Sequence, residues 1–319
     1  MSGRGVRFFW TRPPLANILG CPYIFELMTM KLTEELRALL PTDEDVASYR
    51  ERGWYVSKKI LGPEVIDRAI KGAERHWAGE RDWPLKITEG FKDWKPGDPD
   101  TIRVGEIIAL QNREIRALVE QPIIGAIAAR LAGTDEIRLW ESELIQKPPQ
   151  DRDPKAAVGW HTDRAYWMTC TSVDLLTAWI PFHDCPQAMG PLMVIEGSHK
   201  WTDLDHDHLR EFRNVDLRAK EESIFRDHPG AKKVSMAIEK GQVSFHNSLA
   251  LHGSDFNYSD RPRLVVACHL QDGANRYRKY YNEKGELWKV VADRQCRVGP
   301  DGDPDYSDPA VCPVLWSER

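Results

Sequence analysis

The first part of the chain, about residues 30–135, carries the apolar spacing of amphipathic helices. Acidic residues after a threonine, a proline in a first turn and glycines after the last apolar position mark where the helices begin and end. Residues 80–100 are rich in Trp, Pro, Gly and charge, which predicts a long loop over the functional site. These patterns predict helices at 42–53, 63–77 and 113–131, the last interrupted at Pro122, and a short strand at 54–56.

From residue 136 the pattern changes to short apolar runs separated by Gly, Pro, Asn and Asp. The segment 137–147 has apolar residues on both of its faces, which indicates a strand inside a sandwich. Helices followed by many short strands predict an α+β fold that is mainly β. The number of strands suits a double-stranded β-helix, the cupin-like jelly roll, with the helices packed outside. Further strands are predicted at 172–182, 191–195, 233–238, 242–246, 249–253 and 263–271, with a charged insertion at 203–229.

A length of 319 residues suits one large domain. We expect a single domain over 30–319, made of a helical part (about 30–135), a jelly-roll core (about 136–272) and a C-terminal tail (273–319). Residues 1–29 lack the continuous apolar region of a signal peptide. They are expected to be a poorly ordered extension upstream of a natural start.

Composition limits the partners and the compartment. The formal net charge is −5 and no basic face is apparent, so nucleic acid is not an expected partner. The sequence contains no stretch of 18 or more apolar residues, so no membrane span is expected. Six cysteines without a Cys-x-x-Cys spacing suggest free thiols in the cytoplasm. We therefore expect a cytoplasmic monomer or homodimer that acts on a small molecule.

The chemistry starts from His161 and Asp163, two residues apart. In an extended backbone, residues i and i+2 point to the same face, so both side chains can reach one metal ion. A third ligand must come from elsewhere, and His252 is the best candidate. Two histidines and one carboxylate on one face of a metal are typical of non-haem Fe(II) oxygenases. His246 is the rival, because six residues of unbroken strand would place it on the same face as His252.

Four segments around these residues resemble the phytanoyl-CoA dioxygenase family of Fe(II)- and 2-oxoglutarate-dependent oxygenases. The most specific segment is Gly-Pro-Leu-Met-Val-Ile-Glu-Gly-Ser-His at 190–199. The resemblance covers about residues 136–272 and implies a double-stranded β-helix with Fe(II) held by His161, Asp163 and His252. It also implies 2-oxoglutarate and O2 as cosubstrates. The four segments are 159–163, 179–182 continued by 190–201, 240–247, and 251–254 followed by Asn257, Arg261 and Arg263.

The family places the arginine that binds the far carboxylate of 2-oxoglutarate eleven residues after the distal histidine, which is Arg263 here. A planar guanidinium can hold a carboxylate through two parallel hydrogen bonds. Arg261 is the rival, since period-two geometry would put both arginines on one face. Gln146 resembles the strand glutamine that similar proteins aim at the cosubstrate, with an ordinary surface position as the alternative. Trp179 is a further candidate for the pocket wall.

The residues after the metal pair predict the substrate side: Trp160, Arg164, Tyr166 and Trp167. Aromatic rings with one cation suit a small polar or cyclic molecule that carries an anionic group, and no basic cluster suits the phosphates of CoA. We expect hydroxylation of an unactivated C–H bond with release of succinate and CO2, in bacterial specialised metabolism. Asp163 argues against halogenation, for which related enzymes have a small residue at that position.

Two alternatives use the same residues. A jelly-roll sensor could bind metal and 2-oxoglutarate without turnover, although a complete set of three ligands and Arg263 argues for an enzyme. A zinc hydrolase could use the three ligands, but it would not need Arg263, and the sequence shows no obvious general base beside them.

Overall fold

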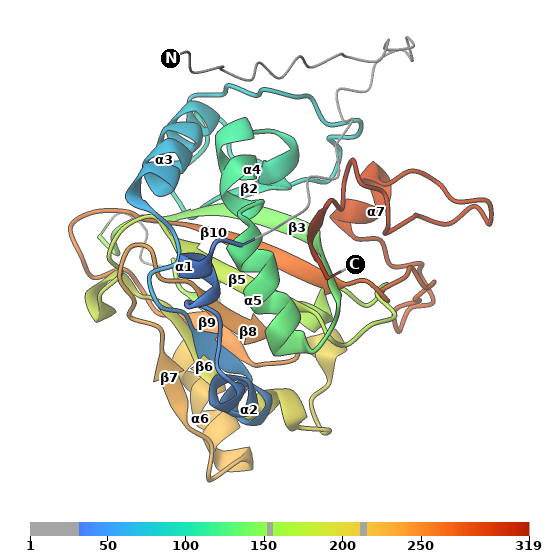
Figure 1. Ribbon diagram of the computed structural model, residues 1–319. Helices are drawn as coiled ribbons and strands as arrows, with labels where there is room; N and C mark the ends of the chain where they lie inside the picture. Colours follow the sequence, from blue (N-terminus) through green and yellow to red (C-terminus); the bar gives the residue numbers. More distant parts are fainter. Residues whose placement is uncertain (1–31, 152–155, 211–215, 319) are drawn as a thin grey trace, which may run out of the picture.

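A computed structural model describes residues 32–151, 156–210 and 216–318. The expected extension at 1–29 lies outside these residues. Two antiparallel sheets form the centre of the molecule (Figure 1). The larger sheet has the order β1 (Trp54–Val56), β8 (Ser244–Asn247), β5 (Leu176–Pro181), β10 (Arg263–Asp272), β3 (Glu136–Lys147) and β11 (Val314–Ser317), with β2 (Arg103–Glu106) also paired to β3. The smaller sheet has the order β4 (Val158–His161), β9 (His252–Ser254), β6 (Leu192–Ile195) and β7 (Lys233–Ser235).

The larger sheet is buried on both faces, as its side-chain alternation shows. On β10, Leu264, Val266, Cys268 and Leu270 pack into the cluster that contains the helices, whereas Val265 and Ala267 face the smaller sheet. The residues between the sheets join Ile145, Trp179, Val265 and Ala267 to Val158, Leu192 and Val194. This arrangement confirms the predicted jelly roll, with its interior between the two sheets.

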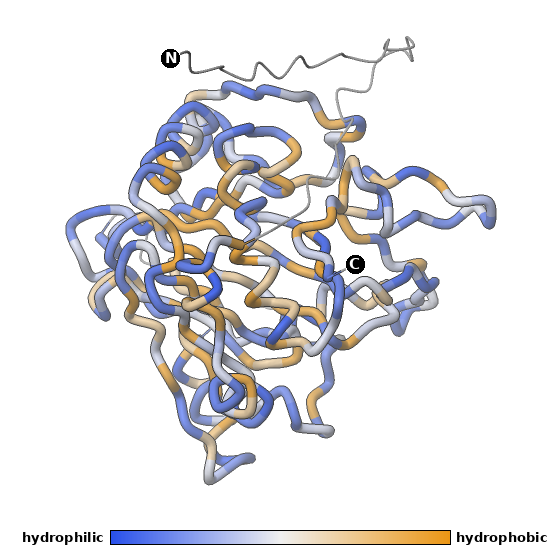
Figure 2. Tube along the Cα trace, viewed as in Figure 1, coloured by the Kyte–Doolittle hydropathy of each residue, from blue (hydrophilic) through white to orange (hydrophobic). Residues whose placement is uncertain are grey.

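Helices cover the outer face of the larger sheet, and α5 crosses it in Figure 1. Apolar positions are concentrated in the strands and on the sides of the helices that meet them, as Figure 2 shows. The predicted helices in the first part of the chain are confirmed, including the break before Pro122. The helices are α1 (Glu34–Arg37), α2 (Asp43–Arg52), α3 (Pro63–Trp77), α4 (Arg113–Val119), α5 (Pro122–Ala132), α6 (Leu217–Asp227) and α7 (Val291–Gln295).

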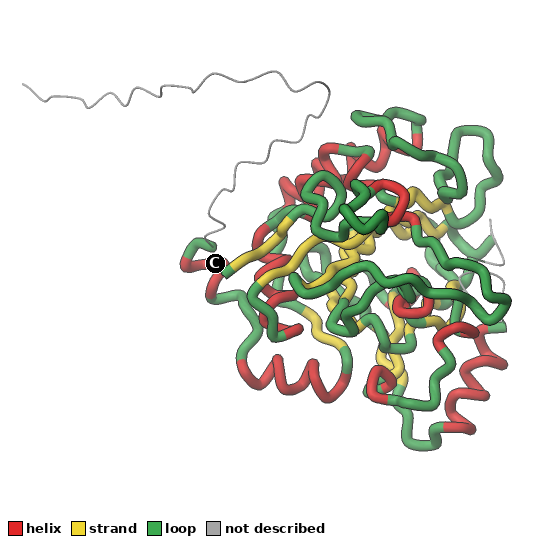
Figure 3. The backbone as a smooth tube through the Cα atoms, turned by 90° about the vertical axis from the view of Figure 1, so that its right-hand side faces the viewer, coloured by secondary structure: helices red, strands yellow, loops and turns green. Residues whose placement is uncertain are grey.

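The segment after residue 272 is more than a trailing tail. It forms α7 and ends in β11, which pairs with the first residues of β3. β2 was also not predicted, because Arg103–Glu106 contains a glycine and two charged residues and gains its order from pairing with β3. Figure 3 shows how much of the surface around the strands consists of such loops and short elements.

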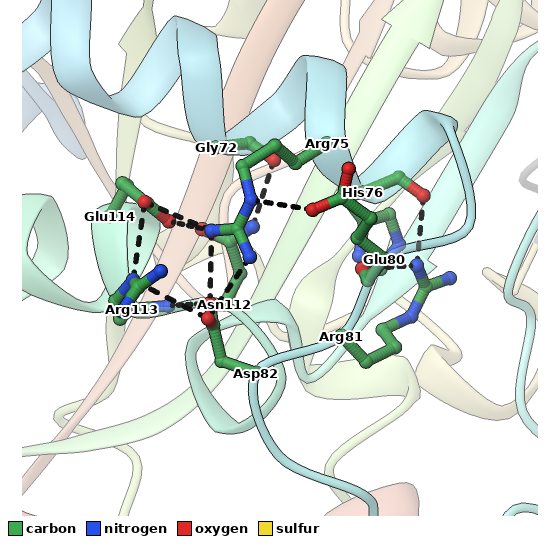
Figure 4. A network of polar contacts seen from close by, with 9 residues as sticks. All are labelled: Gly72, Arg75, His76, Glu80, Arg81, Asp82, Asn112, Arg113 and Glu114. Carbon is green, nitrogen blue, oxygen red and sulfur yellow. Dashed lines mark hydrogen bonds and ion pairs between the residues drawn. The ribbon is translucent and has the colours of Figure 1, made fainter.

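The predicted long loop after α3 is held by ion pairs (Figure 4). Arg75 of α3 contacts Asp82 at 3.0 Å and Glu114 of α4 at 2.8 Å. Further along the loop, Arg81 pairs with Asp93 at 2.9 Å. These contacts fix the loop on the helical layer, and its residue Lys92 lines the cavity described below. Through Lys92, the loop thus contributes to the wall of that cavity.

Candidate active site

His161, Asp163 and His252 lie together in the interior. One ligand atom from each lies within 4.8 Å of the others, and His252 Nε2 is 3.4 Å from Asp163 Oδ1. His161 ends β4 and is the register partner of His252 at the start of β9. Asp163 follows the strand, in a 3-10 turn over Asp163–Ala165, and the extended backbone of Thr162 keeps the two side chains on one side. The same-face argument holds, although the strand stops earlier than expected.

Both histidines are oriented in the same way. His161 Nδ1 lies 2.7 Å from the carbonyl of Gly159, and His252 Nδ1 lies 2.9 Å from that of Ala250. A carbonyl oxygen can only accept, so each Nδ1 carries the proton and donates it. In the neutral form of each ring, Nε2 therefore keeps a lone pair for a metal. A hydrogen bond of this kind fixes both the tautomer and the ring orientation of metal-binding histidines.

A hydroxyl group holds the carboxylate. Thr177 on β5 donates its hydroxyl proton to Asp163 Oδ2 at 2.5 Å. Thr177 Oγ1 also lies 2.8 Å from Nδ1 of His269. The hydroxyl group accepts a hydrogen bond there, because its own proton is donated to Asp163. His269 thus belongs to the interior polar network, and no pattern in the sequence pointed to it.

His246 lies behind Asp163. Its Nε2 is 3.3 Å from Asp163 Oδ2, and its ring centroid is 4.3 Å from that of His252. Among the residues that the structure describes, the compact ligand group contains His252 and not His246. His246 is buried against Asp163, which favours a supporting role over that of a metal ligand.

Electrostatics prepare these groups for a cation. Burial, followed by the neighbouring His252, lowers the pKa of His161 to about 3, so its ring is neutral. Burial alone would raise the pKa of Asp163, but His252 and His246 hold it well below its ordinary value. Burial alone would lower the pKa of His252, but Asp163 raises it above its ordinary value. A divalent metal binds neutral imidazoles and an ionised carboxylate, so its binding would release a proton held by His252. The donor set and its orientation therefore fit iron(II).

A cavity of about 60 Å³ extends from these ligands between the two sheets, and Arg263 lies in its wall. The arginine is 2% exposed and its guanidinium carbon is 5.5 Å from the ring centroid of Trp179, which also lines the cavity. Nη1 donates to the carbonyl of Gly190, but Nε has no hydrogen-bond partner within the described part of the chain. Burial lowers the pKa of Arg263 to about 10. A buried guanidinium with a free donor fits the carboxylate of a bound ligand.

The other two cosubstrate candidates are placed elsewhere. Arg261 is exposed, so Arg263 is the arginine in the cavity. Gln146 lies on the opposite face of β3 from Glu143 and Ile145, and it lines neither cavity. The prediction that Gln146 points toward the cosubstrate is wrong, because side chains alternate between the two faces of the strand. Leu144 shares a face with Gln146 and packs in the apolar cluster beneath the helices.

Lys147 has a buried position that the sequence did not reveal. Its Nζ donates to Ser254 Oγ at 2.6 Å and to the carbonyl of Asp255 at 2.5 Å. Ser254 lines the same cavity as Arg263. Lys147 thus fixes the orientation of a hydroxyl group beside the arginine.

A second cavity, of about 160 Å³, is also lined by His161 and Asp163. Tyr166 and Trp167 line it, as predicted for the substrate side. Trp160 does not, because it is fully buried with apolar residues such as Ile195.

Arg164, also predicted for the substrate side, does not face the larger cavity. Its Nη1 donates to the carbonyls of Cys170 and Ser172 at 3.1 and 2.9 Å, and it does not line the cavity. The prediction of an anionic substrate group rested on this cation, and the position of Arg164 gives it no support.

Sequence reasoning missed most of the cavity wall. Its further lining comes from the loop after α3, from β2 and β3, from β10 and from the C-terminal segment: Lys92, Val104, Glu106, Glu141, Glu143, His269, Trp288, Lys289, Val290 and Val291. These segments are far apart in the chain and meet only through strand pairing, so no local motif could identify them.

A double-stranded β-helix with two histidines and one aspartate converging on one point defines a non-haem iron oxygenase. The model of the phytanoyl-CoA dioxygenase (PhyH) family matches residues 49–265, and the chain belongs to this family. It is thus an enzyme of the iron- and 2-oxoglutarate-dependent dioxygenase type, as the sequence predicted.

Relatives and solved structures agree with this assignment. The peroxisomal phytanoyl-CoA dioxygenase of Rattus norvegicus is 25% identical over 82% of this chain and 78% of its own, and that of Bos taurus is 28% identical over 72% and 68%. The carbocyclase SnoK from nogalamycin biosynthesis superposes with a TM-score of 0.63 at 23% identity, covering 86% of this chain and 96% of SnoK. EctD from S. alaskensis, solved with 2-oxoglutarate and 5-hydroxyectoine, gives 0.59 at 22% identity over 84% and 88%.

A search of the described residues for a helix long and apolar enough to span a membrane found none.

Proposed function

We propose that this protein oxidises an unactivated C–H bond of a small polar or cyclic molecule, with hydroxylation as the outcome and succinate and CO2 as coproducts. The observation that carries the proposal is one continuous interior site. It joins three metal-binding side chains within 4.8 Å to a cavity with the buried guanidinium of Arg263. A sensor would need the ligands and the arginine, but it would not need a second cavity beside the metal ligands.

The chain's own residues divide the work by position. His161, Asp163 and His252 would hold the metal, which when bound supplies oxygen activation coupled to decarboxylation of 2-oxoglutarate. Arg263 and Ser254 would bind the far carboxylate, and Trp179 would form the pocket wall. Thr177 and the two backbone carbonyls keep the ligands in one orientation before the metal arrives.

The substrate would enter the larger cavity. Tyr166 and Trp167 lie beside His161 and Asp163 there, so a C–H bond of a bound molecule would be close to the metal. Similar proteins include SnoK from nogalamycin biosynthesis and EctD, which was solved with 5-hydroxyectoine, and this similarity supports a role in bacterial specialised metabolism. Cytoplasmic location remains a prediction, supported by the free thiols of all five described cysteines.

The experiment is an anaerobic titration of the metal-free protein with Fe(II) and 2-oxoglutarate. We expect the visible charge-transfer band of an iron–2-oxoglutarate complex without any prime substrate. His161→Ala and His252→Ala should abolish it, and Arg263→Gln should weaken it, whereas the exposed control Arg261→Gln should not. Folded, iron-loaded protein without the band would refute the proposal.

A zinc hydrolase is a second candidate, because the structure supplies a possible general base. Glu143 lines both cavities beside the metal ligands, and such a carboxyl group was not apparent in the sequence. Arg263 has no role in that chemistry. Consumption of O2 and formation of succinate by the iron-loaded protein, with no hydrolysis by the zinc-loaded protein, would exclude this candidate.

A further inference from the structure

Three carboxyl groups gather in the larger cavity. Glu106 on β2 is the register partner of Glu143 on β3, and Glu141 lies two residues before Glu143 on the same face. All three line the cavity together with His161 and Asp163. The cavity beside the metal ligands is therefore lined by acidic side chains, which no segment taken alone indicates.

Among the described residues, no cation lies beside Glu141. Glu141 is 8% exposed, and in the described ranges no hydrogen bond or ion pair of its side chain is found. Glu106 accepts from the backbone N–H of Lys92 at 2.9 Å. Lys92 and Lys289 line the same cavity and are exposed, and the charge of Lys92 lowers the pKa values of Glu106 and Glu143. Burial without a counter-charge is costly for a carboxylate, so an unpaired one on a cavity wall indicates a ligand that supplies the charge.

Burial has the expected effect on these side chains. It raises the pKa of Glu143 to about 8, with Glu106 adding to the shift and Lys92 opposing it. It raises the pKa of Glu141 well above its ordinary value, and Glu143 and Glu106 add to that shift. The pKa of Glu106 is also raised by burial. A bound cation would reverse this effect and would favour the ionised carboxylates.

The metal centre does not require the extra carboxyl groups. A divalent metal and Arg263 would bring three positive charges, and Asp163 with the two carboxylates of 2-oxoglutarate would bring three negative ones. Glu106, Glu141 and Glu143 are thus in excess of the charge that the proposed metal and cosubstrate need. In their ionised forms they would be balanced by a cationic group on the substrate, in addition to Lys92 and Lys289 in the same cavity.

Aromatic rings complete the wall. Tyr166, Trp167 and Trp288 line the cavity, and Trp288 is fixed by a 3.0 Å hydrogen bond from Nε1 to the carbonyl of Tyr166. One face of Trp288 carries the guanidinium of Arg210 at 4.2 Å from the ring centroid. Aromatic rings beside carboxylates are the combination that binds organic ammonium groups.

We propose that the prime substrate carries a protonated nitrogen, which Glu141 and Glu143 bind while the aromatic wall packs against its carbon skeleton. This inference rests on the proposed function, because it names the substrate class of the same site. It replaces the anionic group expected from Arg164. It also disfavours an acyl-CoA substrate, since the phosphates of CoA would approach an acidic wall.

Three ring compounds of similar size test the charge preference: cyclohexylamine, cyclohexanol and cyclohexanecarboxylate. Binding is followed by tryptophan fluorescence on the metal-free protein, and by perturbation of the charge-transfer band in the anaerobic iron–2-oxoglutarate complex. A charged hydrogen bond in a buried site predicts that the amine binds about tenfold or more tightly than the alcohol, with the carboxylate weakest. Calorimetry in two buffers of different ionisation enthalpy should show proton release when the amine binds.

Variants assign the preference to residues. Glu141→Gln and Glu143→Gln should each reduce the amine-to-alcohol preference, and the double variant should abolish it while the alcohol still binds. Glu74→Gln, an exposed glutamate on α3, is the matched control and should keep the wild-type preference.

The outcomes separate the two proposals. Equal binding of the three compounds, no binding of any of them at millimolar concentrations, or an amine preference that survives the double variant would overturn the substrate class while the band remains. An amine preference without any band would support the cation site and refute the oxygenase chemistry.

Discussion

Thr177 Oγ1 and Asp163 Oδ2 are 2.5 Å apart. This hydrogen bond connects the candidate carboxylate ligand, which follows the edge strand β4 of the smaller sheet, to β5 inside the larger sheet. The hydroxyl also accepts from His269, so it cannot rotate without losing a bond. The metal ligands are thereby held in place by a residue that does not reach the metal.

Replacing this hydroxyl tests its contribution. Thr177→Val keeps the shape of the side chain and removes the donor, so Asp163 should lose its fixed orientation. We expect iron(II) to bind roughly 10- to 100-fold more weakly, as for other hydrogen bonds behind metal ligands. Anaerobic iron titration measures the change. Thr177→Ser should restore most of the affinity, and equal affinity in Thr177→Val would show that the contact is incidental.

His246 and His252 can be separated by the same titration. His252→Ala removes a proposed ligand and should abolish the band, whereas His246→Ala should keep a band at reduced affinity because Asp163 loses a neighbour 3.3 Å away. A band that persists in His252→Ala and disappears in His246→Ala would reverse the assignment.

Arg263 should determine the affinity for 2-oxoglutarate. Its loss removes charge-assisted hydrogen bonds, which predicts a dissociation constant about 10- to 100-fold higher in Arg263→Gln. Titration of 2-oxoglutarate against the iron-loaded protein gives the value. Arg261→Gln changes an exposed arginine two residues away and should bind like the wild type. If the two variants weakened binding equally, the cavity would not be the cosubstrate site.

Glu143 should make stability depend on pH. Its pKa is about 8 in the folded protein against an ordinary value of 4.5, so the unfolded chain releases this proton first. The folded state therefore loses stability as the pH rises from about 4.5 through about 8. Glu143→Gln removes this loss, and its melting temperature relative to wild type should rise by roughly 2 °C or more between pH 5 and pH 8.5. Thermal unfolding of the metal-free proteins checks it, and a constant difference would contradict the buried carboxyl.

Gly190 supports the arginine through its backbone. It has φ of +59°, and an added Cβ would lie 2.4 Å from the carbonyl oxygens of Asp255 and Phe256. Its own carbonyl accepts from Arg263. Gly190→Ala should cost about 2 kcal/mol or more in unfolding free energy and weaken 2-oxoglutarate binding. Gly230→Ala, with no atom within 4 Å of the added Cβ, is the control and should change neither quantity.

The sequence by itself determined the fold class and the arrangement of the ligands. Helix caps and apolar spacing are local, so α2, α3 and the break before Pro122 were predictable. The pair His161 and Asp163 followed from the geometry of an extended backbone. His252 and Arg263 followed from the resemblance, which supplied the distance along the chain between them.

Only the tertiary structure decided what lines the cavities. β3 is apolar on both faces, because helices cover one side and the interior lies on the other, so its sequence could not show that Glu143 points inward and Gln146 outward. Arg164 follows the metal pair in sequence but turns to backbone carbonyls. Glu106 meets Glu143 through strand pairing, and Trp288 reaches the cavity from the C-terminal segment. Metal ligands close in sequence are set by local geometry, whereas the charge of a substrate cavity is a sum over distant segments that only packing brings together.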